Sequence, residues 1–197
     1  MKRMKKQIAA IILLAALTMT LSACSGGGTP PVLTVAGKEV TLGESALSVF
    51  PMTEFEIKLP NQGMPIGKMP GKSWLSSFMS LSNDDGSYAY LYVYNPDSDE
   101  VMVTSATIYG ISFHMYSEDP DVSYWAQDNA LVNGVDYFGM DAEGVKETMA
   151  EFKTLTESDD YMAYRDGKYT YSFHLDENGI VEEVEVEMKV NKSYTSY

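Results

Sequence analysis

Apolar and polar residues alternate along two stretches of the chain, and each alternation predicts a β-strand. Between residues 87 and 94, small and aliphatic residues alternate with four tyrosines. Between residues 180 and 190, valines and a methionine alternate with charged residues. Because a period of two sends successive side chains to opposite faces of a sheet, the second stretch predicts an antiparallel strand with one buried face and one face in water.

Shorter apolar segments, bounded by turn residues, predict further strands. They lie at residues 32–35, 39–42, 55–59, 73–82, 101–116, 161–164 and 168–175. In the longest of them the apolar side changes between Ile108 and Ile111, so we expect an extra residue, a β-bulge, near Gly110. Residues 60–72 hold three prolines and three glycines and predict a loop.

Two segments predict short helices. Asp141 is a typical N-cap residue, and Val145, Met149 and Phe152 follow it at the spacing of one helix face. Residues 43–50 predict a second helix, which the following proline ends.

Together these elements predict an α+β fold in which one or two short helices pack on antiparallel sheets. Each half of the chain would place a helix before its strands, so the halves could form two similar helix-then-strands lobes. We expect an N-terminal α+β lobe at residues 32–117. A C-terminal lobe, a helix plus an antiparallel meander, would follow at residues 118–197.

The first 24 residues follow a different pattern, which is typical of export. Four basic residues among the first six precede an apolar run at residues 8–17, and small residues follow before Cys24. This order is that of a secretory signal. The run is shorter than the roughly 20 apolar residues that a membrane span needs.

The stretch Leu21-Ser22-Ala23-Cys24 resembles the lipobox of bacterial lipoproteins. In that family the cysteine thiol receives a diacylglycerol, the chain is cut before the cysteine, and the new amino terminus is acylated. The resemblance implies a signal peptide at residues 1–23, cleavage between Ala23 and Cys24, and a lipid on Cys24. The protein would then be extracytoplasmic and anchored to the cell membrane, or to the outer membrane of a Gram-negative host. The alternative is an ordinary secretory signal with a coincidental cysteine.

Composition limits the chemistry that the folded part can perform. Residues 24–31 are rich in glycine and proline and predict a lipidated, flexible tether. After cleavage, ten basic residues would face 28 acidic residues, because four of the 14 basic residues lie in the signal, so the mature net charge would be −18. Such a charge repels nucleic acid and anionic headgroups and suits a cationic partner or solubility. Cys24 is the sole cysteine, so its lipidation would exclude disulfides and thiol chemistry.

A second resemblance concerns residues 132–190. Phe138-Gly139-Met140-Asp141, the predicted helix and the meander through Asn178-Gly179 resemble the helix-on-sheet units of β-lactamase-inhibitor-like and outer-membrane-assembly lipoproteins. The whole layout also resembles small lipoproteins of Gram-positive bacteria. The first resemblance implies a binding or scaffolding domain, and neither implies a functional residue in this chain.

Few residues point to catalysis or to a metal. His114 and His174 are the two histidines, and alternation places both on water-facing sides of their strands. Residues 119–123 offer acidic oxygens, but the glycine and glutamate that an EF-hand needs are absent from its sixth and twelfth positions. Gly71-Lys72-Ser73 has no upstream glycine of a phosphate loop. We therefore expect no metal, no cofactor and no nucleic acid partner.

The strongest candidate for ligand binding is aromatic. One face of the predicted strand at residues 87–94 carries four tyrosines, and one face of the neighbouring strand adds two more aromatic residues. They are Tyr88, Tyr90, Tyr92, Tyr94, Trp74 and Phe78. An open face of this kind would form a platform for sugar rings or a peptide, whereas a covered face would be core.

The sequence thus predicts a membrane-anchored, extracytoplasmic lipoprotein that binds a protein, peptide or glycan without catalysis. A protein inhibitor or an envelope-assembly accessory is the alternative. A hydrolase ranks third, because nothing singles out a pair of carboxylates among 28 acidic residues.

Overall fold

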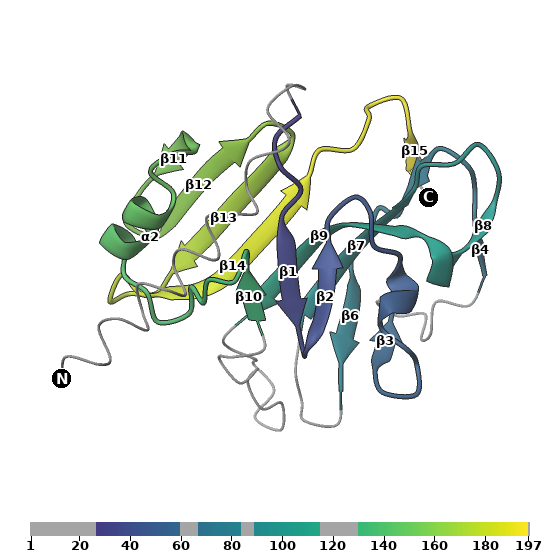
Figure 1. Ribbon diagram of the computed structural model, residues 1–197, viewed down its shortest axis with the longest axis horizontal. Coiled ribbons are helices and arrows are strands. Elements are labelled where there is room, and N and C mark those ends of the chain that lie inside the picture. The colour runs from purple at the N-terminus through teal and green to yellow at the C-terminus, as the bar shows by residue number, and fades with distance from the viewer. Residues whose placement is uncertain (1–26, 60–66, 84–88, 115–129, 197) are drawn as a thin grey trace, which may run out of the picture.

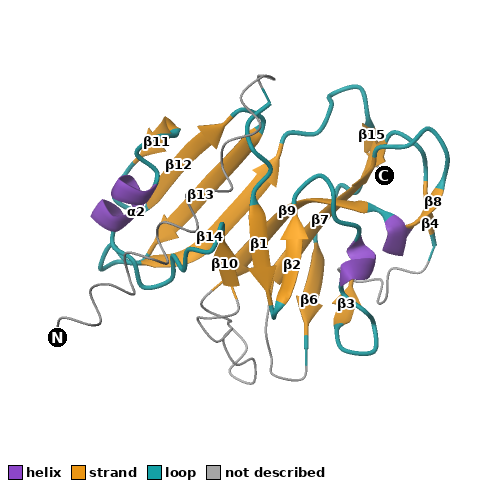
Figure 2. Cartoon of the chain, in the orientation of Figure 1, coloured by secondary structure: helices purple, strands orange, loops and turns teal. Residues whose placement is uncertain are grey.

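The computed structural model describes residues 27–59, 67–83, 89–114 and 130–196. These residues form mostly antiparallel β-sheet with one α-helix (Figure 1, Figure 2). Within them, no helix is long and apolar enough to cross a membrane. The predicted signal, including Ala23 and Cys24, lies outside the described residues.

A ten-stranded sheet forms the body of the molecule. Eight of its strands follow the order β11 (Lys153–Glu157), β12 (Tyr161–Asp166), β13 (Tyr169–Leu175), β14 (Val181–Met188), β9 (Thr107–His114), β7 (Ala89–Asn95), β5 (Ser73–Trp74) and β15 (Thr195–Ser196). Two more strands, β6 (Met79–Ser82) and β3 (Glu56–Lys58), continue from β7. All neighbours are antiparallel except β15 and β5.

Smaller elements cover one face of this sheet. A three-stranded sheet has the order β10 (Ala130–Val132), β1 (Val32–Val35) and β2 (Lys38–Thr41). It lies in front of the large sheet in Figure 1, as does the helix α2 (Ala142–Thr148). A two-stranded sheet, β4 (Lys68–Met69) and β8 (Val101–Met102), and two 3-10 turns, η1 (Leu47–Val49) and η2 (Val103–Ser105), complete the described elements.

The covered face of the large sheet is the hydrophobic core. The apolar residues of the alternating strands point toward the smaller elements and are fully buried, as the sequence pattern predicts. Examples are Leu91, Ile111, Phe113, Phe173 and Val186, each 0% exposed. β1 and β2 contribute Leu33, Val35 and Val40 from the other side.

The predicted helix after Asp141 is confirmed. The Asp141 carboxylate accepts the backbone N–H of Gly144 at 2.8 Å, which satisfies a free donor of the first turn. Val145 and Met149 are buried. Phe152 lies beyond the last helical residue, where its ring stacks on Tyr171 with 5.2 Å between centroids.

The predicted bulge near Gly110 is also confirmed. Tyr92 of β7 pairs with Gly110 of β9, but Val93 pairs with Ile108, so Tyr109 is the extra residue. This insertion keeps Ile108 and Ile111 on the covered face although they lie three residues apart.

Four local predictions are wrong. Residues 43–50 form only the 3-10 turn η1, because their backbone groups bond to β9 and to the residue before it: the N–H of Gly43 donates to Ile108 O, and that of Leu47 donates to Ala106 O. The predicted strand at 73–82 is two strands, β5 and β6, and the one at 101–116 divides into β8, η2 and β9 within its described part. Within the predicted loop at 60–72, residues 68–69 form β4.

One sheet contains strands from both sides of the predicted lobe boundary. The boundary, between residues 117 and 118, lies outside the described residues. β9 and β14 pair over five residues from Gly110 to His114, so the predicted lobes share the large sheet. β10 likewise pairs with β1.

Candidate functional site

The second face of the large sheet carries aromatic and carboxylate side chains. Register places them together: Tyr90 of β7 pairs with Ser112 of β9, and Ser112 pairs with Glu185 of β14. The helix and the three-stranded sheet lie in front of the large sheet in Figure 1, and alternation along the strands directs these side chains to its other side. We call this surface the tyrosine face and define it by Tyr90, Tyr92, Tyr94, Tyr109, Ser112, His114, Glu183, Glu185 and Glu187.

One aromatic group lies at the β6–β7–β9 side of the tyrosine face. The rings of Phe78 and Tyr90 have centroids 4.1 Å apart, and those of Tyr90 and His114 have centroids 4.7 Å apart in an edge-on arrangement. Both Phe78 and Tyr90 are half-buried. These contacts hold the rings in place while part of each stays in contact with solvent.

A second aromatic group depends on the β-bulge. Because Tyr109 is the extra residue, its ring joins those of Tyr92 and Tyr94, at centroid distances of 5.9 and 6.0 Å. Tyr194 stacks on Tyr94 at 6.2 Å from the segment before β15. Gly110 leaves the space this group needs, since a Cβ there would lie 3.1 Å from both Tyr92 Cδ2 and Glu187 Cγ.

Three glutamates of β14 lie beside these rings. Glu183, Glu185 and Glu187 occupy alternate positions of one strand and therefore the same face. Burial, together with the neighbouring charges of Glu187 and Glu183, raises the pKa of Glu185 to about 7, although a hydrogen bond from Tyr92 lowers it. Burial also raises the pKa of Glu187. The face predicted to be wet is therefore half-buried, and among the described residues no lysine or arginine forms an ion pair with these carboxylates.

The phenols beside these glutamates stay protonated. Burial raises the pKa values of Tyr92 and Tyr109 above their ordinary range, and the charges of Glu185 and Glu187 act in the same direction. Each phenol is therefore available as a hydrogen-bond donor at any physiological pH.

His114 belongs to a polar network and does not simply face water. Its Nε2 lies 3.0 Å from Ser112 Oγ, and its Nδ1 lies 3.5 Å from Glu183 Oε2. The Ser112 hydroxyl donates to Glu183 Oε1 at 2.9 Å. Burial lowers the pKa of His114, the charge of Glu183 opposes this, and His174 adds to it. The prediction of a water-facing imidazole is corrected, because the side chain is only 23% exposed.

Ser112, His114 and Glu183 are the residue types of a catalytic triad, but the hydrogen bonds among them differ from those of a triad. A nucleophilic serine must give its proton to the histidine, whereas the single Ser112 proton goes to Glu183. Ser112 is also only 1% exposed, so a substrate carbonyl cannot approach it. The network thus satisfies buried polar atoms and does not form a nucleophile.

The predicted aromatic residues are only partly accessible. Tyr90 and Tyr92 are half-buried, whereas Tyr94 is 8% exposed between Tyr109 and Tyr194. Trp74 pairs with Tyr94 across β5 and β7 and is half-buried. Tyr88 lies outside the described residues.

The remaining predicted features lie beside the tyrosine face, elsewhere or outside the described residues. His174 of β13 pairs with Glu183 of β14 and packs against Tyr161, with 4.8 Å between ring centroids, so this imidazole is half-buried and does not simply face water. The Lys72 ammonium bonds to the carbonyl of Pro96, so this residue holds a turn. Residues 119–123 lie outside the described residues. Across residues 27–59, 67–83, 89–114 and 130–196, no group of three or more His, Cys, Asp or Glu side chains is arranged to hold a metal.

The sequence pattern did not indicate that the glutamates belong beside the tyrosines. Their strands are separated by about 90 residues of sequence, and only the β9–β14 pairing brings them together. For Tyr109 the sequence held one usable signal. A bulge at Gly110 changes the side of the sheet on which the neighbouring Tyr109 points. Comparisons of the chain with protein-family models, with curated proteins and with solved structures found no match.

Proposed function

We propose that this protein is an extracytoplasmic lipoprotein, attached to a membrane through Cys24, whose tyrosine face binds a cationic segment of a protein or peptide without catalysis. One observation carries the binding proposal: three glutamates of β14 lie beside aromatic side chains on one sheet face. Aromatic rings offer rigid contact area, and they and carboxylates both attract ammonium and guanidinium groups.

The charge state of the glutamates favours a cation over a neutral sugar. Burial and the charges of two neighbouring carboxylates together raise the pKa of Glu185 to about 7. A guanidinium group beside it would supply the missing countercharge and release the proton. A sugar ring would stack on the same tyrosines but would leave the negative charge uncompensated.

The alternative roles use the same surface. A protein inhibitor or an envelope-assembly accessory would also act by binding a protein segment, so the tyrosine face serves either role. A hydrolase receives no support from Ser112, which is buried and donates to Glu183.

We also propose that the fold is α+β, with two similar helix-then-strands lobes. This arrangement is supported by the position of η1 before β3 and of α2 before β11. In each half, a helical turn comes before antiparallel strands.

Calorimetric titration with a hexaarginine peptide tests the proposed ligand class, with the neutral sugar chitohexaose as comparator. We expect the peptide to bind and the sugar not to bind. Replacing Glu183, Glu185 and Glu187 by Gln should weaken peptide binding at least tenfold. Binding should also strengthen as the pH rises from about 5.5 to about 8, because the cation requires ionised Glu185.

A charge-matched control separates this site from the general acidity of the chain. Glu54→Gln, Glu56→Gln and Glu100→Gln together remove the same charge from exposed ion pairs elsewhere. This control should change affinity less than twofold. Equal losses in the two triple variants, or binding of chitohexaose alone, would contradict the proposal.

A further inference from the structure

The chain that follows Cys24 is fastened to one end of the large sheet. Gly27 O accepts the backbone N–H of Lys168 at 3.2 Å, and the N–H of Thr29 donates to Asp166 Oδ2 at 3.0 Å. The contact with the β12–β13 turn is close, since a Cβ on Gly167 would lie 2.2 Å from the carbonyl carbon of Gly27. The N-terminal segment therefore packs against the β12–β13 turn of the fold.

Covalent geometry limits how far this end can be from a lipid on Cys24. Only three residue steps separate Cys24 from Gly27. An extended chain covers at most about 3.6 Å per residue, so the two Cα atoms are within about 11 Å. This distance is close to the Debye length of about 8 Å at physiological salt, so charges at the turn would act on the headgroups.

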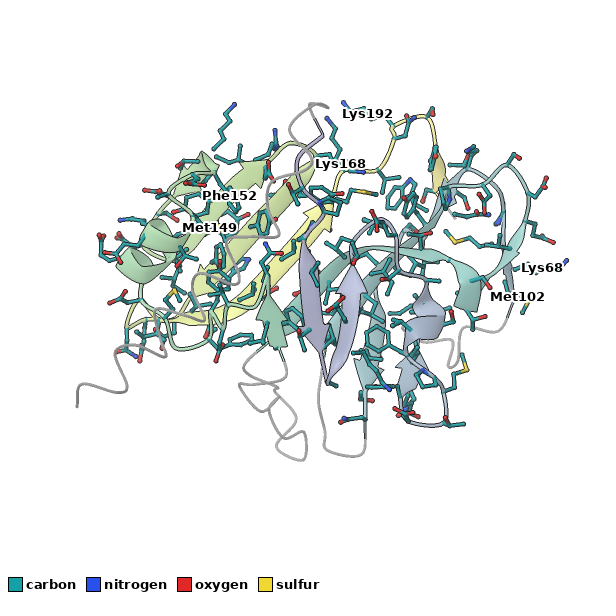
Figure 3. The ribbon with its side chains drawn as sticks, in the orientation of Figure 1. Lys68, Met102, Met149, Phe152, Lys168 and Lys192 are labelled. Atoms are coloured by element: carbon teal, nitrogen blue, oxygen red, sulfur yellow. The ribbon has the colours of Figure 1, made fainter. Side chains whose placement is uncertain are left out.

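Five exposed cations gather at this end. Lys153 of β11 pairs in register with Arg165 of β12, and the N–H of Lys189 donates to Lys168 O at 2.8 Å. Figure 3 places Lys168 and Lys192 at the same edge of the molecule. We call Lys153, Arg165, Lys168, Lys189 and Lys192 the basic end.

A small cavity lies within the basic end. Arg165, Lys168 and Lys189 line it together with Glu187, and its volume is about 290 Å³. Two acids are close by, Asp166 and Glu187. The Asp166 carboxylate accepts the Thr29 N–H, and burial favours the neutral form of Glu187 by raising its pKa.

Most of the other cations of the mature chain have acidic partners. Four of these five cations form ion pairs with glutamates at 2.6 to 2.9 Å: Lys38, Lys58, Lys68 and Lys146. The fifth, Lys72, bonds to the carbonyl of Pro96. In the part of the chain that the structure describes, no cation of the basic end has such a partner. A chain with 28 acidic residues thus leaves its unpaired cations mainly at the end nearest Cys24.

We propose that the basic end faces the membrane that carries the Cys24 lipid and contacts its anionic headgroups. The inference rests on the proposed lipid attachment. Net charge alone predicts that the protein is repelled by anionic headgroups. In the proposed orientation the acidic surface is directed away from the bilayer, and the cations contact the headgroups. The tyrosine face stays open to a partner beside the membrane, because its rows of side chains run along β14 away from this end.

Lysine protection in vesicles tests this orientation. The mature acylated protein is inserted into preformed vesicles of phosphatidylcholine with phosphatidylglycerol and treated with a membrane-impermeant amine-acetylating reagent. Peptide mass spectrometry then compares each lysine with the same lysine in detergent micelles. We expect acetylation of Lys153, Lys168, Lys189 and Lys192 to fall at least threefold. That of Lys58, Lys68 and Lys146 should change less than about 1.5-fold, because interactions between exposed charges beyond a Debye length are largely screened.

Variants and salt identify the cause of the protection. K168Q/K189Q/K192Q should restore acetylation of Lys153 to its level in micelles, whereas K58Q/K68Q/K146Q, which removes the same charge, should not. Salt of about 1 M should also restore it, because the Debye length shortens to about 3 Å. Equal acetylation in vesicles and micelles, with the lipid present on Cys24 by mass, would overturn the orientation alone. An unmodified Cys24 would overturn the lipoprotein proposal and this inference together.

Discussion

The covered face and the tyrosine face of the large sheet alternate along the same strands, yet they bury different side chains. In one row Leu91, Ile111 and Val186 are each 0% exposed beneath the smaller elements. In the adjacent row, ring contacts hold Tyr90, a hydrogen bond holds Ser112, and burial with neighbouring charges raises the pKa of Glu185 to about 7. The first row stabilises the fold by apolar burial. In the second row, burying carboxylates costs free energy that apolar burial alone does not offset. This cost favours a role in binding.

The largest expected effect comes from deleting a ring on the covered face. Phe113→Ala should lower the free energy of unfolding by about 4 kcal/mol, because it leaves a cavity in a fully packed core. Urea denaturation measures this change. Tyr90→Ala, from the same sheet but the half-buried side, should cost about 1 kcal/mol. Equal losses would break the comparison and make the tyrosine face a second core.

The pH dependence of stability sharpens the comparison further. The pKa of Glu185 is raised from its ordinary 4.5 to about 7 in the folded protein. The folded state therefore holds the proton more tightly than the unfolded state, so stability falls as the pH rises from about 4.5 to about 7. Glu185→Gln removes this loss and should stabilise the protein by about 2 kcal/mol at pH 8, with little change at pH 4.

Thermal unfolding at the two pH values measures the Glu185 effect. The control is Glu56→Gln, which removes an exposed carboxylate paired with Lys58 and should change stability by less than about 0.5 kcal/mol. Destabilisation by Glu185→Gln at pH 8 would mean that the ionised carboxylate is already compensated by a partner within the protein.

The smallest effect concerns the bulge that completes the second aromatic group. Gly110→Ala places a Cβ 3.1 Å from Tyr92 Cδ2 and Glu187 Cγ, so these side chains must move. We expect a loss of about 1 kcal/mol in stability, together with a several-fold loss of hexaarginine affinity. Thr170→Ala, on the same face of β13, is the control and should change neither. Unchanged affinity in Gly110→Ala would separate Tyr92 from the binding surface.

Local patterns in the sequence predicted local structure well. The alternation of residues 180–190 predicted β14, the change of side around Gly110 predicted the bulge, and Asp141 predicted the start of α2. Each feature depends on residues only a few positions apart, whose spacing fixes which side of a strand or helix they occupy.

Structure that depends on distant partners could not be predicted in this way. Residues 43–47 have a helical composition, but their backbone groups bond to β9 instead. β11 and β10 show no alternation that marks them as strands, and pairing with β12 and β1 defines them. The aromatic platform was predicted from β7 and from Trp74 and Phe78 before it, without its glutamates, because these come from β14 in the other half of the chain.

By itself, the sequence determined which side chains share a face, since a strand's period of two is a property of the covalent chain. It also placed Cys24 three residues before the first attached residue. Only the tertiary structure decided which face is covered, how deeply Glu185 is buried and where the unpaired cations gather. Burial and charge balance depend on segments far apart along the chain, and these meet only when β14 pairs with β9 and the N-terminal segment meets the β12–β13 turn.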